Sequence, residues 1–562
     1  MRSTNVWPDN PAGSGVEVMK YRFNWNYPVF FSPHNPDKLY AGSNFLHVTT
    51  NGGQFWEVIS PDLTRGEPET LKSSGGPITQ DNTGVEFYGT IFAGEESEQE
   101  EGVIWIGSDD GLVHVTRDGG KTWKDVPPPL SPMQNMINCI DVNPHKNGGA
   151  YVAATSYKFG DYTPYLYKTD DYGETWKLIT KGINETNYTR AIRADLTRPG
   201  LLYAGTEWGM YVSFDDGASW QPFQLNLPIV SIRDLHVKDN NLIAATHGRS
   251  FWLIDDLTPL HQLSDEVAQA DQYLFKPKDS YRMQSGGWGT PKSVGENHPN
   301  GVIFNYYLKD LQEGDKVALH LLEMDGDTIQ SFSNTTKNRR TRLSARSGGN
   351  TFVWNMRYPG FTEFEGMILY SSPNNGPKAV PGIYKAVLSV NGNAVSQDFK
   401  IIKDPRLPNT SADYQKQFDY LISVRDKVTL AHEAIIRIRD MRKTLEYIKE
   451  KVGDKDASAQ EVVKLVNELD AEMKVIENNI HMTKNQSYQD PLNFGIRINN
   501  RIAFLMADQQ RGDYPPTDQA VAFKNEVFKE LDTELLNLNS LLNEKELAIK
   551  QKLSQMGISL MN

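Results

Sequence analysis

The chain has 562 residues, a formal net charge of −13 and an isoelectric point near 5.4. A chain of this length is several times the size of one domain, so we expect more than one hydrophobic core. The acidic balance argues against a nucleic-acid surface, because phosphate binding needs clustered Lys and Arg. Cys139 is the only cysteine, which excludes internal disulfides and metal sites built from several cysteines.

The N-terminal residues 1–21 lack the apolar core of a secretory signal. No stretch approaches the roughly 18 consecutive apolar residues of a membrane span, so no transmembrane segment is predicted. Two interpretations of the compartment remain: the protein is cytoplasmic, or a signal lies on a missing N-terminal part.

Four similar segments between residues 49 and 220 mark an internal repeat. Each follows the pattern Ser/Thr-x-Asp-x-Gly-x-Thr/Ser-Trp, with Asn51 and Phe55 as departures in the first copy. We call these segments the box turns. Their Asp or Asn side chains are expected to accept hydrogen bonds from the turn, and their glycines to take positive φ, so the role predicted for them is structural. The acceptors are Asn51, Asp118, Asp171 and Asp215, and the turns end at Trp56, Trp123, Trp176 and Trp220.

Short apolar runs precede each box turn, and a fifth unit near residues 241–256 repeats the runs without the box. Four short strands per unit, repeated in series, are typical of a β-propeller blade. We therefore predict a mainly β fold with a propeller segment of five blade units over residues 1–262, with a solenoid or a sandwich as the alternative. The innermost strands are expected near residues 28–33, 85–92, 137–144, 189–196 and 230–237.

Residues 20–36, 61–69, 107–123, 167–176 and 245–260 resemble the Asp-box (BNR) propellers of sialidases, of other glycoside hydrolases and of the sortilin receptor domain. The chain is similar to a bacterial group labelled sortilin-like or BNR-repeat "glycosyl hydrolase", over residues 1 to about 262 and more weakly to the end. Members of that group are longer and carry further repeats. The resemblance therefore implies a missing N-terminal half, or a second chain, that supplies more blades. It also implies an exported protein, periplasmic or at the cell surface.

Residues 263–299 are rich in Gly, Pro and polar residues and are predicted to be a linker. Residues 300–403 contain β-rich runs separated by Gly and Asn turns, which predicts a small β-sandwich that is immunoglobulin-like in architecture. The runs are residues 301–308, 316–323, 328–333, 350–358, 382–390 and 394–402.

Residues 404–562 change to a helical periodicity, with apolar residues recurring at intervals of three and four. Helices near 457–480 and 491–509 would complete an antiparallel bundle, and Thr517 is a candidate N-cap for the last helix. The alternative is a coiled-coil arm that dimerises.

The motifs of zinc proteases, P-loops, nucleophile elbows and EF-hands are absent, so no metal or cofactor is predicted. The propeller geometry instead predicts a ligand site at the channel mouth, where the turns between second and third strands should lie. These turns carry Asn44, Asp109, Asp110, Tyr157, Lys158, Glu207, Trp208, His247 and Arg249, and the inner strands add Glu86, Tyr88, Arg190, Arg193 and Arg233.

If the protein is an enzyme, the predicted reaction is hydrolysis of a glycosidic bond by two carboxylates, one acting as acid and the other as base or nucleophile. The catalytic candidates are Glu207 or Glu86 with Asp109 or Asp110. The remaining mouth residues are predicted to bind ligand: Tyr88, Lys158, Arg190, Arg233, His247, Arg249 and Trp208. Tyr88 with the arginines 190, 233 and 249 could imitate a sialidase site, although the Arg-Ile-Pro signature of sialidases is absent.

Each of these residues also has a structural interpretation. Asp109 and Asp110 suit a tight turn for its own sake, and Arg193 or Arg233 could pair with an Asp between blades. At the level of function, the alternative to a hydrolase is a sortilin-like module that binds a peptide or glycan without chemistry, or a scaffold in the cell envelope.

Overall fold

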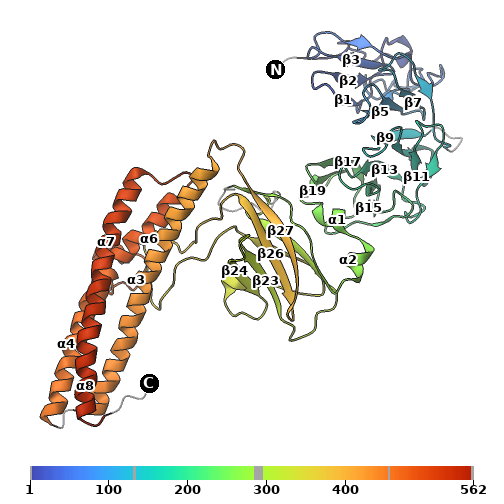
Figure 1. The fold of residues 1–562 in the computed structure, drawn as a ribbon. Coiled ribbons are helices and arrows are strands. Elements are labelled where there is room, and N and C mark those ends of the chain that lie inside the picture. The colour runs from blue at the N-terminus through green and yellow to red at the C-terminus, as the bar shows by residue number, and fades with distance from the viewer. Residues whose placement is uncertain (1–2, 131–134, 284–294, 296, 454–455, 559–562) are drawn as a thin grey trace. The chain divides into compact units, whose positions relative to one another are not determined.

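The computed structural model describes residues 3–130, 135–283, 295, 297–453 and 456–558. The chain forms two compact units, Met1–His261 and Gln262–Asn562, which are described separately (Figure 1). The fold is mostly β, with many small sheets followed by a helical region. Among the described residues, none of the helices combines the length and the apolar character needed to cross a membrane.

The first unit consists of five successive antiparallel sheets, each with its strands in chain order. The first sheet contains β1 (Val29–Phe31), β2 (Leu39–Gly42), β3 (Leu46–Thr49) and β4 (Glu57–Val58). The second contains β5 (Ile91–Glu96), β6 (Ile104–Ser108), β7 (Val113–Thr116) and β8 (Lys124–Asp125). The third contains β9 (Met136–Val142), β10 (Ala150–Ser156), β11 (Asp161–Thr169) and β12 (Lys177–Leu178). The fourth contains β13 (Thr189–Ala194), β14 (Leu202–Thr206), β15 (Gly209–Ser213) and β16 (Gln221–Pro222), and the fifth contains β17 (Ile232–Lys238), β18 (Asn241–Thr246) and β19 (Phe251–Ile254).

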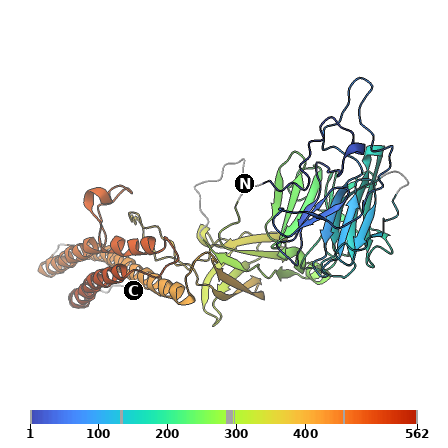
Figure 2. The same cartoon turned by 90° about the horizontal axis from the view of Figure 1, so that it is seen from above.

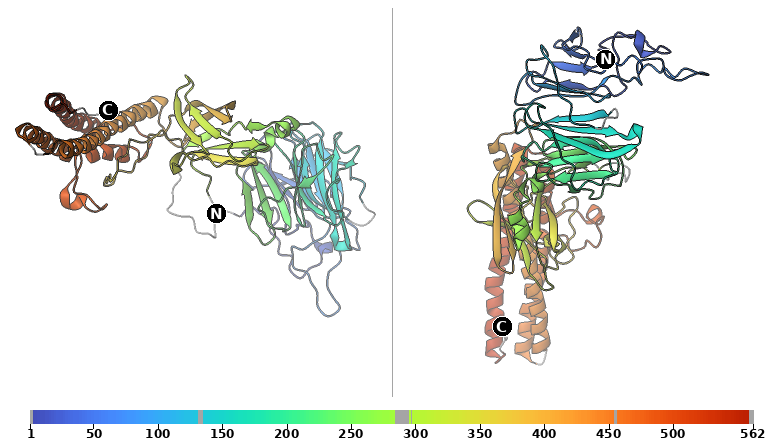
Figure 3. Two further views of the ribbon diagram at one scale, coloured as in Figure 1. Left: turned by 90° about the horizontal axis from the view of Figure 1, so that it is seen from below. Right: turned by 90° about the vertical axis from the view of Figure 1, so that its right-hand side faces the viewer.

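The first strands of neighbouring sheets contact one another, so they form the inner side of the arrangement. Figure 1 shows the five sheets following one another along an open arc, and Figure 3 shows them as separate layers of strands. Each sheet corresponds to one repeat unit predicted from the sequence. One inner strand differs in position: the strand expected over residues 85–92 begins at Ile91, because residues 85–90 belong to the long loop that enters the second sheet.

The box turns form the hydrogen bonds that their sequence indicates. In the third sheet, Asp171 Oδ1 accepts hydrogen bonds from Thr169 Oγ1 at 2.8 Å and from Thr175 N at 2.9 Å, and its Oδ2 accepts one from Thr175 Oγ1 at 2.6 Å. Gly173 has φ of 81°, and a Cβ there would lie 2.7 Å from Val126 Cβ. Only glycine therefore fits this position of the turn, which is pressed against the preceding sheet.

The second unit begins with two sheets that share one hydrophobic core. One sheet contains β20 (Gln272–Leu274), β22 (Val302–Leu308) and β25 (Gly348–Trp354). The other contains β21 (Ser280–Arg282), β27 (Asn393–Lys403), β26 (Gly382–Val390), β23 (Val317–Leu322) and β24 (Thr328–Ser333), in that order. All six strands predicted over residues 300–403 are present.

The described part of the predicted linker 263–299 is not a simple linker. It contains the short helix α2 (Asp265–Gln269) and the strands β20 and β21, which join the edges of the two sheets. These strands are only three residues long. They were not predicted because the surrounding sequence is rich in Gly, Pro and polar residues. Composition alone cannot reveal a strand whose partners lie far along the chain.

The helical region contains α3 (Ser411–Val452), α4 (Ala457–Ile480), α5 (Pro491–Phe494), α6 (Ile498–Gln509), α7 (Asp518–Leu541) and α8 (Leu547–Gln555), with a π-helical turn (Leu542–Glu546) joining the last two. The long helices run alongside one another (Figures 1 and 2) and bury their apolar stripes in one core. The stripes therefore pack within the chain, as the bundle prediction expects. Thr517 Oγ1 accepts a hydrogen bond from Ala520 N and caps α7, as its sequence position indicates.

The sandwich and the helices are joined within this unit by buried contacts. Arg282 of β21 is 2% exposed, and its Nη2 donates to Gln417 Oε1 of α3 at 2.8 Å and to Asp513 Oδ1 at 3.1 Å. The loop between β25 and β26 places Phe361 and Phe364 in the helical core. The boundary predicted at residues 403 and 404 therefore divides a continuous packed structure.

Candidate functional site

The inner strands of the first unit line one cavity of about 990 Å³. Residues from all five sheets contribute to its wall, because the first strand of each sheet faces the inside of the arc. The acidic and basic side chains on the wall, histidines included, are Glu95, Lys158, Arg190, Arg193, Arg233, Asp234, His236 and His247. A concave site with several convergent polar groups is the usual form of a ligand site.

Arg190 and Glu207 form an ion pair beside this cavity. The Nε of Arg190 on β13 lies 2.6 Å from Oε2 of Glu207, which occupies the turn between β14 and β15. Ser231 Oγ donates to the same oxygen at 2.7 Å. Burial alone would raise the pKa of Glu207, but the hydrogen bonds from Ser231 and Arg190 outweigh burial and lower it. Glu207 is thus held ionised, which does not suit a general acid.

Two aromatic rings fix the guanidinium of Arg190. The rings of Tyr157 and Tyr188 stack with centroids 5.1 Å apart, and the guanidinium carbon lies 4.9 Å from each centroid. Arg190 is 5% exposed. The charge is therefore placed rigidly at the wall, with Tyr157 beside it as a lining aromatic surface.

Lys158 and Arg233 give the cavity positive charge. Both line it, and in the described part of the chain no carboxylate forms an ion pair with either side chain. The guanidinium of Arg233 instead donates to Nδ1 of His247, with Nη2 at 2.9 Å. Three predicted ligand-binding residues from the third and fifth sheets are thus brought together at one cavity.

Asp109 and Asp110 do not line the cavity. Asp109 accepts hydrogen bonds from Thr90 N at 2.8 Å and from Thr90 Oγ1 at 2.9 Å. Asp110 accepts from Ser108 Oγ at 2.5 Å and from Arg65 N at 2.9 Å. Both carboxylates are buried, and burial raises the pKa of Asp109 to about 6. Their contacts join the turn between β6 and β7 to the preceding long loop, which is the structural interpretation of these residues.

Four further predicted residues do not line the cavity. Glu86 is exposed and accepts from Thr83 Oγ1 at 3.0 Å, because it lies in the loop before β5 rather than on an inner strand. Tyr88, in the same loop, lies near Asp109 and Asp110, and burial together with these two charges raises its pKa. Arg249 and Trp208 are exposed at turn tips.

Three carboxylates that were not predicted from the sequence, Glu95, Asp141 and Asp234, lie around Arg193 on the inner strands. Arg193 Nη2 is 3.1 Å from Asp234 Oδ1 of β17, and its Nε is 3.6 Å from Asp141 Oδ1 of β9. Asp141 Oδ2 accepts from Ala194 N at 2.7 Å, and Glu95 Oε2 accepts from Val142 N at 2.7 Å. Glu95 and Asp141 therefore each bind the backbone of the next sheet, and Arg193 pairs with aspartates between sheets, as one of its two interpretations predicted.

Two carboxyls of this cluster, those of Glu95 and Asp141, have raised pKa values. Burial raises the pKa of Glu95, and the nearby Asp141 adds to the effect, while Arg193 opposes it. Burial likewise raises the pKa of Asp141. The sequence signal was present: Glu95 and Asp141 are charged residues near the ends of largely apolar first strands, at positions that contact the neighbouring sheet.

No protein-family model matches the chain, and no curated protein matches it in sequence. Among solved structures, it is similar to a GH74 xyloglucanase from Xanthomonas campestris, with 16% identity, a TM-score of 0.31, and coverage of 42% of this chain and 37% of that one. It is also similar to YCF48 from Cyanidioschyzon merolae, with 20% identity, a TM-score of 0.23, and coverage of 30% and 53%. A third is the extracellular domain of a hybrid two-component system, BT3049, from B. thetaiotaomicron, with 12% identity, a TM-score of 0.29, and coverage of 68% and 44%.

These neighbours are β-propeller proteins. The matched part spans about 37 to 53% of their lengths. TM-scores this low establish no shared activity, so the function must be argued from the residues of this chain.

Proposed function

We propose that the first unit is a propeller segment whose inner cavity binds a negatively charged glycan without cleaving it. The observation that carries the proposal is the pair of cations, Lys158 and Arg233, which line the cavity without a carboxylate partner in the described structure. Cations that form no ion pair within the protein attract anionic groups, and the ring of Tyr157 supplies the flat apolar surface that a sugar face needs.

Binding is favoured over hydrolysis because the predicted catalytic carboxylates are already engaged. Asp109 and Asp110 bond to Thr90, Ser108 and Arg65, and Glu207 is ion-paired with Arg190. A glycosidase needs two carboxyls on either side of the scissile bond, one of them protonated at the working pH. Glu207 is held ionised, and Asp109 and Asp110 are bonded to a neighbouring loop and do not line the cavity, although burial raises the pKa of Asp109 to about 6.

The test is a binding titration with uronic-acid oligosaccharides and their neutral counterparts. Arg233→Ala and Lys158→Ala should each weaken binding of the acidic ligand about tenfold, equivalent to roughly 1.4 kcal/mol. Arg249→Ala is the matched control, because Arg249 is an exposed arginine outside the cavity whose Nη1 bonds only to Gly248 O. Equal affinity for neutral and acidic ligands, or equal losses in all three variants, would contradict the proposal.

Hydrolysis remains a second candidate on one observation, the raised pKa values of Glu95 and Asp141. A carboxyl with a raised pKa can serve as a general acid near neutral pH. Glu95 lines the cavity, while Asp141 lies behind it against Arg193. Release of reducing ends from a polysaccharide panel, abolished by Glu95→Gln, would favour this candidate; no release from any member would dismiss it.

The sequence resemblance further supports an exported protein in which the repeat sheets are propeller blades of a ring larger than five. The sandwich would then be an immunoglobulin-like accessory module. Fractionation of cells that express the natural gene tests the location, since an exported protein appears in the periplasm or at the surface.

A further inference from the structure

The end sheets of the first unit expose faces that every internal junction buries. At each internal junction, apolar residues of a third strand pack against the first and second strands of the next sheet. Met210 and Val212 of β15, for example, are 5% and 2% exposed and pack against Leu235 and Val237 of the fifth sheet. In the first, second and third sheets, the residues equivalent to Met210 are Leu46, Val113 and Leu166, and all three are fully buried.

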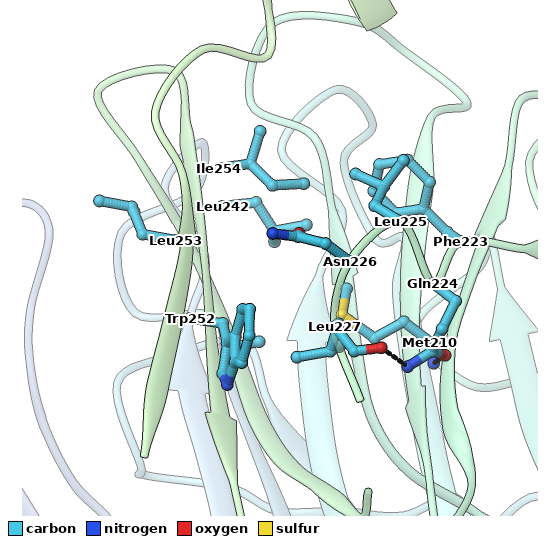
Figure 4. A pocket seen from close by; sticks show the side chains of 11 residues that line it. Met210, Phe223, Gln224, Leu225, Asn226, Leu227, Leu242, Trp252, Leu253 and Ile254 are labelled. Atoms are coloured by element: carbon cyan, nitrogen blue, oxygen red, sulfur yellow. Dashed lines mark hydrogen bonds between the residues drawn. The ribbon is translucent and has the colours of Figure 1, made fainter. Parts of the chain in front are cut away.

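The fifth sheet repeats this face, but nothing in the described unit covers it. The strand registers make Phe251 and Leu253 the equivalents of Met210 and Val212. Phe251 is 76% exposed and Leu253 is 54% exposed. Side chains alternate along a strand, so their neighbours point the other way. Figure 4 shows Trp252 and Ile254 directed toward Met210 and Phe223 of the fourth sheet, where only a groove of about 40 Å³ remains, while Leu253 points to the opposite side.

The first sheet exposes the complementary face. In the first sheet, Val29 pairs with Ala41 and Phe31 pairs with Leu39. In the fourth sheet, Ile192 and Ala194 pair with the equivalent residues Ala204 and Leu202. Val29 and Phe31 are therefore the equivalents of Ile192 and Ala194. Ile192 and Ala194 are buried against the third sheet, at 0% and 5% exposure. Val29 and Phe31 are 53% and 63% exposed. The two ends of the arc therefore carry the two halves of one junction.

The outer rim shows the same complementarity. The box-turn tryptophans donate from Nε1 to the carbonyl of the residue that follows the fourth strand of the preceding sheet: Trp123 to Ile59 at 3.0 Å, Trp176 to Val126 at 2.9 Å and Trp220 to Ile179 at 2.6 Å. In the first sheet, Trp56 donates to Thr4 O at 3.1 Å. Thr4 therefore stands where the end of a preceding fourth strand belongs, and the fifth sheet is the one that has only three strands.

From these matching ends we infer that two copies of the chain associate head to tail, with the fifth sheet of each copy packed on the first sheet of the other. Phe251 and Leu253 of one copy cover Val29 and Phe31 of its partner, and the segment at Thr4 lies at the outer edge of the partner's three-stranded sheet. A head-to-tail contact of this kind forms a ring when its rotation closes. Two arcs then enclose the cavity that one arc leaves open. This inference rests on the sheets alone and is independent of glycan binding.

The test is the mass of the purified full chain in solution, measured by light scattering across a concentration series. The expected mass is twice the 63.5 kDa of one chain. Phe251→Asp with Leu253→Asp, and separately Val29→Asp with Phe31→Asp, should each give monomers, since all four side chains are exposed in one copy and their replacement leaves its core intact. Ile78→Asp is the control, because Ile78 is 98% exposed and belongs to the long loop between β4 and β5 rather than to a strand of either end sheet.

Mixing the two double variants gives a sharper result. Each variant retains one intact half of the junction, so the mixture should form a heterodimer although neither variant associates alone. A wild-type monomer at every concentration would overturn the inference, as would open-ended polymers or a dimer that survives both double substitutions. Assembly only with a different polypeptide would overturn it as well, because the partner would then not be a second copy.

Discussion

Ser231 and Arg190 converge on one oxygen of Glu207, with Oγ at 2.7 Å and Nε at 2.6 Å. Arg190 and Glu207 belong to the fourth sheet and Ser231 precedes the first strand of the fifth, so this oxygen joins two sheets at the wall of the cavity. A substitution at Glu207 can therefore test whether this residue holds the wall together or takes part in catalysis.

Glu207→Gln keeps the shape of the side chain and removes its charge. Arg190 is nearly buried and would lose its charged partner, so the free energy of unfolding should fall by about 1 to 3 kcal/mol. Affinity for an acidic glycan should stay equal or rise, because a negative charge leaves the site. Denaturant titration and ligand binding measure the two effects, and a hundredfold loss of glycan turnover would instead mark Glu207 as a catalytic residue.

Asp118 of the second box turn is predicted to act on stability alone. Its Oδ1 accepts from Thr122 N at 2.9 Å and its Oδ2 accepts from Thr122 Oγ1 at 2.7 Å, and these bonds lower its pKa to about 2. Asp118→Ala should lower the melting temperature and leave ligand affinity unchanged. Asp118→Asn is the matched control, because Asn51 fills the same position in the first sheet and accepts from Phe55 N at 3.1 Å. Loss of affinity at unchanged melting temperature would refute the assignment.

The helical region is expected to lose stability in mild acid. His432 and His481 are 0% and 3% exposed, both contact Asn499, and burial lowers the pKa of each to about 4. In the unfolded chain a histidine takes up a proton below about pH 6.5, whereas the folded chain does so only near pH 4. The unfolded state therefore binds more protons between these values, and stability falls as the pH decreases through this window, by roughly 3 kcal/mol for each histidine at most.

Urea unfolding of the full chain between pH 4.5 and 7.5, followed by helical circular dichroism, measures this dependence. His432→Gln combined with His481→Gln should flatten the curve even if the variant is less stable overall. His298→Gln, at an exposed histidine, should leave the slope unchanged. A slope that persists in the double variant would show that other groups cause the acid sensitivity.

Local patterns predicted the elements well. The helix expected near 457–480 coincides with α4, and Thr517 caps α7, because helical periodicity and capping depend on residues close in sequence. The repeat units were equally visible, since four of them carry a box turn that satisfies its own hydrogen bonds and the fifth repeats the apolar runs. The short strands β20 and β21 were missed because their strand character comes only from distant partners.

The cavity wall was predicted only in part. Lys158, Arg190, Arg233 and His247 do line it, whereas Asp109 and Asp110 accept hydrogen bonds from Thr90 and Arg65 and do not line it. Repeat position identifies which turn a residue occupies. It does not show whether the side chain points to the cavity or to a loop from elsewhere in the chain. Both aspartates form hydrogen bonds with the long segment between β4 and β5.

The buried arginine of β21 limits how this protein could be rearranged. Domains that meet through a solvated linker can be exchanged as independent cassettes. Arg282 instead requires Gln417 and Asp513 on the helical side, and the helical core requires Phe361 and Phe364 from a loop of the sandwich. Removing either the sandwich or the helical region would leave an unpaired charge or an open core in the part that remains. We therefore expect the sandwich and the helical region to be inherited, and lost, together.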